Sequence, residues 1–556
     1  MRKILITTCL LASISLSSIA QTSDTTTRIK NFIKVWGFLK YYHPLIATDN
    51  IDWDSAFVNN IQAIINAKKS TEFNNKLLEV INSAGKAPQL KQKKITDSLF
   101  LMNKTNINWI TTSTAFNNKV KMQLKYIYYN KNQDASRYIK ILNNTADFSG
   151  EKTYDNLGFP DKRYRLLFLS RFWNMINYFA PYKYLTTNWD NVLQKLIPKI
   201  ISSKGTISYY KTLEELSKSL NDGHSQLTLS GQRSATDLFF GSYTPPFYCE
   251  ILDKQVIIRN VGNDLIAKSL NIKQGDVVLK INGEEVTKII AQRKMYISSS
   301  NQADENHQLS GFILDGQTPK ATLEIKRDNK IIKTTITRIS TKNRDWGAFI
   351  NYTYNDVGYK KLNDSILLIY AMQIWNGNID TIKHLIKQSK AVIFDVRNHP
   401  QNDAFFLIAD PFLSEPKMID YSTIALPLFP SLFKWKANPN KIGHVNESAY
   451  KGKVIILCDE RTQSQGEYSC MVLQTIPGSV TIGSETAGAD GLVTYIPLGS
   501  GLTISYSGYG VYYPDKTQTQ RVGIKIDFPV KKTLEAIRNN KDEILERALR
   551  YVNNGK

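Results

Sequence analysis

A hydroxyl and an imidazole, far apart in the sequence, are the side chains of this chain best suited to chemistry. The hydroxyl is Ser464, in the segment Thr-Gln-Ser-Gln-Gly-Glu over residues 462–467, directly after the apolar run Val454–Leu457. The imidazole is His224, in an Asn-Asp-Gly-His-Ser segment. A serine hydroxyl is a weak nucleophile until a base takes its proton. The two residues are the minimum needed for serine acyl transfer, although spacing alone does not show which side chains meet in space.

The same residues also have a purely structural interpretation. Ser-x-x-Glu is typical of a capping box, in which Ser464 caps a helix and Glu467 reaches back to it. A histidine after a turn, such as His224, is commonly a surface residue. If Ser464 begins a helix, the N–H of Gln465 lies at the helix N-terminus, where it could stabilise an oxyanion. The sequence leaves both interpretations of Ser464 open, and they do not exclude each other.

The elements that must position these residues fall into successive blocks. With 556 residues the chain is too long for a single core. Helical patterning predominates in one block, short alternating strands in the next, and buried strands alternate with helical segments in a third, which is typical of an α/β domain. We therefore expect a multidomain α+β protein. The expected parts are residues 1–20, 21–230, 240–340, 345–535 and a C-terminal helix over 536–556.

The helical block contains an internal repeat. In each copy a tryptophan precedes a proline by eight residues and a Trp-Asp pair follows; the copies are Trp36, Pro44, Trp53-Asp54 and Trp173, Pro181, Trp189-Asp190. The spacing predicts a helix that ends at the proline, then a turn into a second helix. The repeat is either a duplicated core with aromatic side chains packed between helices or a duplicated element that grips a substrate.

Composition limits the class of protein. A hydrophobic fraction of 42% indicates a globular chain, and the net charge of +22 comes from lysines scattered along it rather than from a nucleic-acid-binding motif. A protein that binds a surface through its basic charge is a remote alternative. Residues 1–20 have the basic start, apolar middle and small-residue end of a signal peptide, so we expect export to the periplasm or the exterior. Cleavage leaves Cys249, Cys458 and Cys470, an odd number that does not predict a disulfide framework.

Two motifs carry a resemblance to a known family. The segment over 272–283, with turn dipeptides on both sides of one strand, resembles a PDZ domain, whose sheet edge accepts a peptide; a PDZ-like domain can also serve only as a spacer. The whole order of segments resembles the S41 serine peptidases, the tail-specific or C-terminal-processing group. Ala489 stands where the Ser-Lys branch has its lysine, and the Glu-Thr-Ala-Gly run before it resembles the histidine branch, which includes the tricorn core.

The resemblance implies a fold and site residues. It implies a helical N-terminal domain, a PDZ-like β domain and a ClpP/crotonase-like α/β catalytic domain. It makes Ser464 the nucleophile, His224 the base and the Gln465 N–H half of the oxyanion hole. It places Gln520 near the position of the acidic residue that steadies the base, with Asp222 as a local substitute. No metal or organic cofactor is implied.

One further departure from the family concerns the oxyanion hole. The family has a glycine-rich turn after Asp-x-Arg, but here Asp395-Val396-Arg397 is followed by Asn398, His399, Pro400 and Gln401. Proline has no N–H to donate, so a second donor must come from one of the other three residues or be absent. We expect a secreted serine endopeptidase that acts on polypeptides. The alternative is a catalytically impaired relative that binds peptides or apolar ligands.

Overall fold

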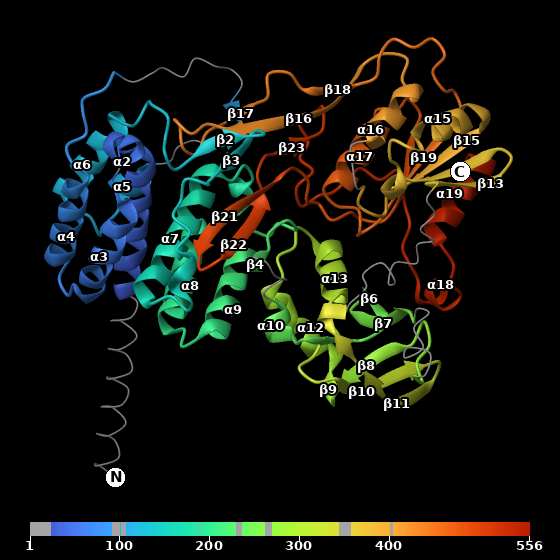
Figure 1. Ribbon diagram of the computed structural model, residues 1–556, viewed down its shortest axis with the longest axis horizontal. Helices are drawn as coiled ribbons and strands as arrows, with labels where there is room; N and C mark the ends of the chain where they lie inside the picture. The colour runs from blue at the N-terminus through green and yellow to red at the C-terminus, as the bar shows by residue number, and fades with distance from the viewer. Residues whose placement is uncertain are drawn as a thin grey trace. The chain divides into compact units, whose positions relative to one another are not determined.

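The computed structural model describes residues 24–49, 51–91, 100–101, 107–186, 188–229, 236–261, 270–343, 357–400 and 404–555. Helices and strands alternate along them, which confirms a multidomain fold of mixed helix and sheet (Figure 1). The chain forms two compact units: Met1–Leu216 with Ile424–Trp435 and Thr494–Ile504, and Ser217–Thr423 with Lys436–Val493 and Ser505–Lys556. The expected signal peptide lies outside the described residues, and the expected domain boundaries stay predictions.

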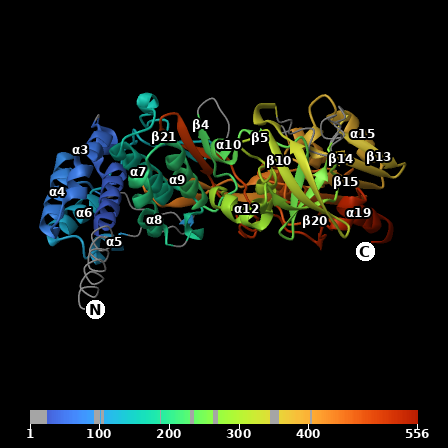
Figure 2. The ribbon, with the colours of Figure 1, turned by 90° about the horizontal axis from the view of Figure 1, so that it is seen from below.

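The first unit is built from helices, and the predicted repeat shapes it. A helix over residues 24–42 is followed by α2 (Pro44–Thr48) and α3 (Trp53–Asn66), and α7 (Lys162–Phe179) is followed by α8 (Trp189–Ser202). The residue before each proline is extended, as proline sterics require. Helix α4 (Ser70–Ser83) packs beside α3, and α6 (Asn118–Tyr129) packs beside α4 in the same unit (Figure 2).

Reciprocal hydrogen bonds between tryptophans close each copy of the repeat. The indole N–H of Trp36 donates to the carbonyl of Trp53 at 2.9 Å, and that of Trp53 donates back to the carbonyl of Trp36 at 3.0 Å. Trp173 and Trp189 exchange the same two bonds, both at 3.1 Å. Each pair ties the last turns of one helix to the start of the next. The duplication seen in the sequence is therefore a duplication of structure.

Ion pairs cross between the copies at equivalent positions. The residue two before the first tryptophan pairs with the aspartate of the other copy, so that Lys34 binds Asp190 and Arg171 binds Asp54. The two pairs differ in their surroundings. The side chains of Arg171 and Asp54 are 0% and 5% exposed, whereas that of Asp190 is 47% exposed. The Arg171–Asp54 pair is therefore buried, whereas the carboxylate of the Lys34–Asp190 pair is half exposed to water.

A six-stranded sheet forms the centre of the second unit. Its order is β13 (Tyr359–Asn363), β14 (Ile366–Tyr370), β15 (Ala391–Asp395), β19 (Lys453–Cys458), β20 (Val480–Gly483) and β24 (Phe528–Pro529). All neighbours run parallel except β13 with β14. The sequence has apolar runs of strand length over residues 365–370, 391–395 and 454–457, which predict strands, and these runs are β14, β15 and β19.

Helices cover both faces of this sheet. Side chains of α15 (Ile379–Gln388), α16 (Ala404–Ala409) and α17 (Gln465–Gln474) share one core cluster with it. Those of α19 (Glu543–Asn554) share the other. Burial on both faces explains why β14, β15 and β19 are continuous apolar runs rather than alternating ones.

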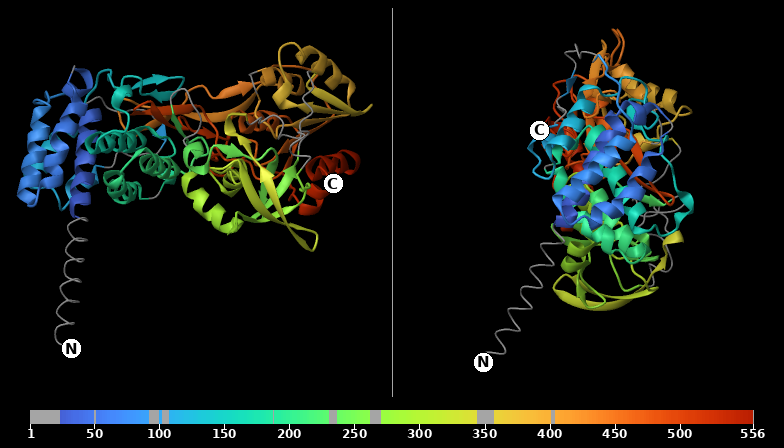
Figure 3. Two further views of the ribbon diagram at one scale, coloured as in Figure 1. Left: turned by 60° about the horizontal axis from the view of Figure 1, so that its bottom comes forward. Right: turned by 90° about the vertical axis from the view of Figure 1, so that its left-hand side faces the viewer.

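A second, antiparallel sheet of the same unit has the order β11-β10-β8-β7-β6. Its strands are β6 (Tyr248–Leu252), β7 (Gln255–Asn260), β8 (Val277–Ile281), β10 (Lys320–Arg327) and β11 (Lys330–Thr337), and the long β10–β11 hairpin is visible in Figure 3. The predicted turn after β8 has left-handed residues at Asn282 and Gly283. Helix α12 (Val286–Arg293) and α13 (Gln302–Ser310) share its core.

Two properties of the described residues bear on the expected class of protein. None of the helices in the described ranges has the length and apolar character needed to cross a membrane. Cys249, Cys458 and Cys470 are buried free thiols. All three cysteines are therefore reduced and pack in the protein interior.

The two equivalent ion pairs should contribute unequally to stability. We expect Arg171→Met to lower the free energy of unfolding by about 3–5 kcal/mol, because it leaves Asp54 and Glu151 buried without their guanidinium partner. The matched variant Lys34→Met should cost at most about 1 kcal/mol, since Asp190 is half exposed to water. Urea unfolding of both variants measures the difference. Equal losses would contradict the asymmetry.

Candidate active site

Ser464 lies at the turn between β19 and α17, where the parallel sheet presents its carboxyl edge. Its backbone has φ 55° and ψ −122°, a conformation that costs a non-glycine residue energy and is stable only when its surroundings fix it. A sharp, strained strand-to-helix turn is the geometry that exposes a serine hydroxyl as a nucleophile. The N–H of Ser464 donates to the carbonyl of Ala489 at 2.8 Å. That bond fixes the turn from outside the helix.

The capping-box interpretation of Ser-x-x-Glu is wrong. The Ser464 side chain makes no hydrogen bond to the helix it precedes. The fully buried Glu467 carboxylate instead accepts from the Thr486 hydroxyl at 2.5 Å and from the N–H groups of Gly488 and Ala489, both at 2.8 Å. Burial raises the pKa of Glu467 to about 7. Glu467 therefore fixes the loop that contains Ala489, and the carbonyl of Ala489 in turn fixes Ser464.

The imidazole of His224 is oriented through a hydroxyl. His224 Nδ1 lies 2.9 Å from the Ser507 hydroxyl oxygen, and that hydroxyl donates to Asp222 Oδ1 at 2.9 Å. Because the hydroxyl has one hydrogen and gives it to the carboxylate, Nδ1 must be the protonated nitrogen that donates to it. Asp222 also accepts from the N–H of Ser507 at 2.7 Å and from the N–H of His224 at 3.0 Å. The network leaves His224 Nε2 as the basic nitrogen.

Hydrogen bonds bring the two expected catalytic segments together. The side chain of Gln463 donates to the carbonyl of Gly223 at 3.1 Å, so the residues just before Ser464 and His224 are joined. A methyl group on Gly223 would lie 2.5 Å from the Asp304 carboxylate and 3.1 Å from the Ala489 side chain, so a glycine is needed for this close packing. His224 Nε2 is buried and has no hydrogen-bond partner among the described residues. Catalytic hydrogen bonds are often loose before substrate binds, so an unpaired Nε2 is compatible with a base.

Burial and a second histidine lower the pKa of His224. Desolvation is the largest cause, Asp222 opposes it by favouring the imidazolium, and His399 adds repulsion. The shift keeps the imidazole neutral, which is the form that can accept a proton. His399 comes from the loop after β15, so that loop also faces the site.

The loop after β15 contains the residues considered for a second oxyanion donor. It lies against the Ser464 turn, because the Thr462 hydroxyl donates to the carbonyl of Val396 at 3.0 Å. Arg397 anchors it by pairing with Asp395 and Asp542. Asn398 is 7% exposed, and its Nδ2 has no hydrogen-bond partner among the described residues.

The backbone decides which of the other residues considered as oxyanion donors has an N–H to offer. Pro400 is buried and has no N–H, and Gln401 lies outside the described residues. Gln465 is the first residue of α17, so its N–H has no partner inside the helix. The Gln465 N–H and the Asn398 side chain are thus two donors on neighbouring segments.

Gln520 does not orient His224 by a hydrogen bond. Its side chain is buried, and its Nε2 lies 3.5 Å from the hydroxyl of Ser300, which accepts from the N–H of Gly223. The ring nitrogen that Gln520 was expected to hold is bonded to Ser507 instead. Asp222, the substitute considered from the sequence, reaches the ring through Ser507. No pattern in the sequence pointed to Ser507, because its pairing depends on the return of a distant strand.

Comparison with known proteins finds one family model and several solved structures that match this chain. Residues 365–530 match the model of Peptidase family S41. The structure of mature CPAF matches with a TM-score of 0.55 and 15% identity, over 71% of this chain and 98% of CPAF. Mature CPAF complexed with lactacystin matches with a TM-score of 0.53 and 13% identity, over 71% and 99%. Curated protein sequences give no match. The chain therefore contains a domain of Peptidase family S41, over residues 365–530.

Proposed function

We propose that the chain is a serine-type endopeptidase in which Ser464 is the nucleophile and His224 the general base. The observation that carries the proposal is the strained Ser464 turn, hydrogen-bonded to Ala489 and joined through Gln463 to the segment of a histidine with a free basic nitrogen. The family match of the surrounding domain supports the same reaction class. Ser507 and Asp222 act as positioning residues for the imidazole.

The proposed reaction has two halves. The Ser464 oxygen attacks the carbonyl carbon of a peptide bond while its proton passes to His224 Nε2, and the resulting oxyanion accepts hydrogen bonds from the Gln465 N–H and the Asn398 side chain. The C–N bond then breaks, and the proton on Nε2 goes to the leaving amine. Water, with its proton taken by the same nitrogen, releases the acyl group and restores Ser464.

We further propose that the antiparallel sheet presents the substrate as an added strand in the manner of a PDZ domain. The outer edge of β6 is not wholly available, because the N–H of Ile251 donates to the Ser310 hydroxyl of α13 at 3.0 Å. Peptide addition there must break this bond. Hydrogen exchange of the Ser464→Ala variant with a long peptide tests it: slower exchange of the β6 amides supports the proposal, and unchanged exchange contradicts it.

Export of the protein is likewise a proposal, and it rests on residues 1–20 alone. N-terminal sequencing of the protein from fractionated cells tests it. A mature chain in the cell envelope or the medium that begins near residue 21 supports export, and an intact N-terminus in the cytoplasm contradicts it.

Loss of either proposed catalytic side chain should abolish most activity. We expect Ser464→Ala and His224→Ala each to lower kcat/KM on a peptide substrate by at least about a thousandfold, and the double variant to be no worse, since the two residues act as a unit. Ser448→Ala, a change at an exposed serine of the same unit, is the control. Labelling by a fluorophosphonate should follow the same pattern. Absence of labelling in the wild type would favour the alternative, a catalytically impaired binding protein.

The pH profile should report His224. Activity requires the neutral imidazole and is lost as pH falls through its pKa, so the lowered pKa predicts an acid limb of kcat/KM with its midpoint below 6.5. Asp222→Asn should move this limb to lower pH because the carboxylate favours the charged ring. His399→Gln should move it to higher pH because a repelling charge is removed. Shifts in the same direction for both variants would contradict the assignment.

The Asn398 side chain should replace the missing glycine amide of the oxyanion hole. We expect Asn398→Ala to lower kcat by about 10²–10³-fold with little change in KM, as removal of one oxyanion donor typically does. Pro400→Gly restores a backbone N–H at the neighbouring position and is the discriminating control. It should give no gain if Asn398 already fills the site. A gain in kcat with Pro400→Gly and no loss with Asn398→Ala would show that the donor is absent.

A further inference from the structure

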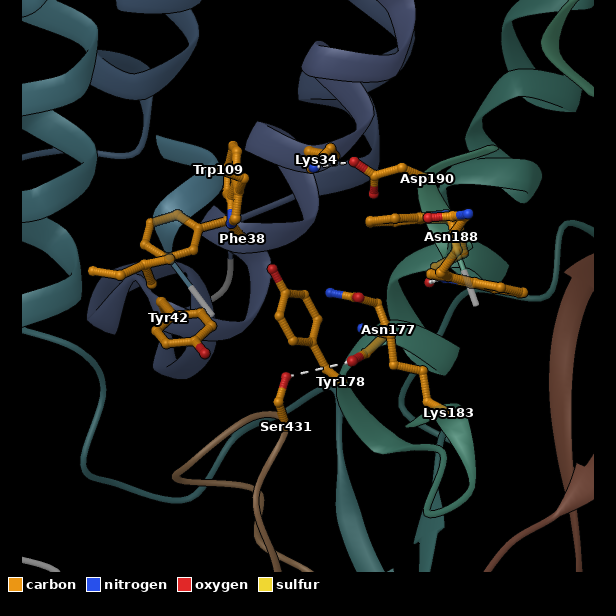
Figure 4. Close-up of a pocket in the computed structure, with 13 residues that line it drawn as sticks. Lys34, Phe38, Tyr42, Trp109, Asn177, Tyr178, Lys183, Asn188, Asp190 and Ser431 are labelled. Carbon is orange, nitrogen blue, oxygen red and sulfur yellow. Dashed lines mark hydrogen bonds and ion pairs between the residues drawn. The ribbon is translucent and has the colours of Figure 1, made fainter. Parts of the chain in front are cut away.

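A cavity that the peptidase chemistry does not use lies between the second copy of the repeat and the helix over residues 24–42. It lies within the first unit and has a volume of about 350 Å³ (Figure 4). Six aromatic side chains form much of its wall: Phe38, Tyr42, Trp109, Trp173, Tyr178 and Trp189. Two lysines, Lys34 and Lys183, also line it, with one carboxylate, Asp190. A cavity of this size, with an aromatic wall and several convergent polar groups, is typical of a small-molecule site.

Several polar groups of the cavity are not used by the fold. The Lys183 ammonium makes no hydrogen bond or ion pair with the described residues, and the Asn188 side chain does not cap α8, which it precedes. Asn188 and Ser431 both have left-handed backbones, with φ of 56° and 74°. Such strained residues persist where the surroundings fix them and are concentrated at binding sites.

The first copy of the repeat shows what an equivalent site looks like when it is filled. There Arg171, Trp36 and Asp54 stand at the positions that Lys34, Trp173 and Asp190 occupy around the cavity. The carboxylate of Glu151 inserts among them. It is 0% exposed, 2.7 Å from the Lys40 ammonium and 3.3 Å from the Arg171 guanidinium. The chain thus supplies its own carboxylate to one copy.

The two equivalent sites differ in the net charge of their side chains. In the filled copy Lys40 and Arg171 face Asp54 and Glu151, so the buried charges cancel. Around the cavity the two lysines face only Asp190, which leaves one positive charge in excess. Lys34 also lies over aromatic rings, 5.0 Å from that of Trp109 and 5.9 Å from that of Trp173. An anion that enters would complete the balance that Glu151 provides in the other copy.

Burial also disfavours the charged form of Lys183, the lysine whose ammonium makes no hydrogen bond within the described part of the chain. Desolvation lowers the pKa of Lys183, the Asp190 carboxylate opposes this, and the Lys34 charge adds to it. A bound carboxylate would favour the ammonium form and relieve the repulsion between the two lysines.

We propose that this cavity binds a carboxylate attached to an apolar or aromatic body of one or two amino-acid residues. The carboxylate lies between Lys34 and Lys183, as Glu151 lies between Lys40 and Arg171, and the body packs against the aromatic wall. Two sources share this chemistry: the C-terminal residue of a peptide and a free small carboxylate.

Calorimetric titration of the full chain with N-acetyl-phenylalanine tests the proposal. Its neutral twin, N-acetyl-phenylalaninamide, should bind at least about tenfold more weakly, and the cation phenethylamine more weakly still, because only the acid pairs with the lysines. Lys183→Gln should weaken binding of the acid by about tenfold and leave the amide unchanged. Lys204→Gln, at an exposed lysine of the same unit, should change neither.

The three probes test the wild-type protein, so the result does not depend on whether a variant folds. Equal binding of acid and amide, or no binding of the acid at millimolar concentration, overturns the proposal. So does unchanged acid binding by a folded Lys183→Gln variant. Competition by the tripeptide Ala-Ala-Phe assigns the site to peptide ends, whereas failure of the tripeptide to compete with the bound acid assigns it to free small carboxylates.

Discussion

The hydrogen bond from the Ser464 N–H to the Ala489 carbonyl is the constraint on which the proposed active site depends. A left-handed serine at a strand-to-helix turn is not stable by itself, so the turn must be fixed by a partner outside the helix. Ala489 belongs to a loop that the buried carboxylate of Glu467 grips through a hydroxyl and two amides. Glu467 lies one turn further along the helix that Ser464 begins. Glu467, a residue of helix α17, therefore holds the loop that fixes Ser464, the residue just before the helix.

The parallel sheet explains why the parts of the site meet. β15 and β19 are neighbours, so the loops that follow them leave the sheet at the same edge and bring Asn398 beside the Ser464 turn. His224 comes from outside this sheet and is held by other means. Its ring depends on Ser507, at the end of β22 (Leu502–Ser507), and on Asp222, two residues before it. The imidazole of the proposed base is thus fixed by Asp222, nearby in the chain, and by Ser507 from one distant strand.

The sequence predicted the parts of the site that depend on local pattern. The apolar runs of β14, β15 and β19, the position of Ser464 at a helix start and the duplicated Trp-Pro element all follow from periodicity and turn chemistry. Side-chain partners were less predictable. Glu467 has the spacing of a capping residue and yet faces away from the helix start, and the His224 ring is held by Ser507 rather than Gln520. These pairings join residues far apart in the chain, and no local propensity encodes them.

The two copies of the repeat share one backbone arrangement but differ in the charges that they bury. Reciprocal tryptophan bonds are the same in both, but only the first copy buries a neutral set of four charges. Substitutions in that copy disrupt the buried ion network and therefore destabilise the fold. The second copy borders on solvent, and its lining can change at little cost to the fold. One helix pair therefore serves the fold alone, whereas its structural equivalent keeps Lys183 and Asn188 at the wall of a cavity.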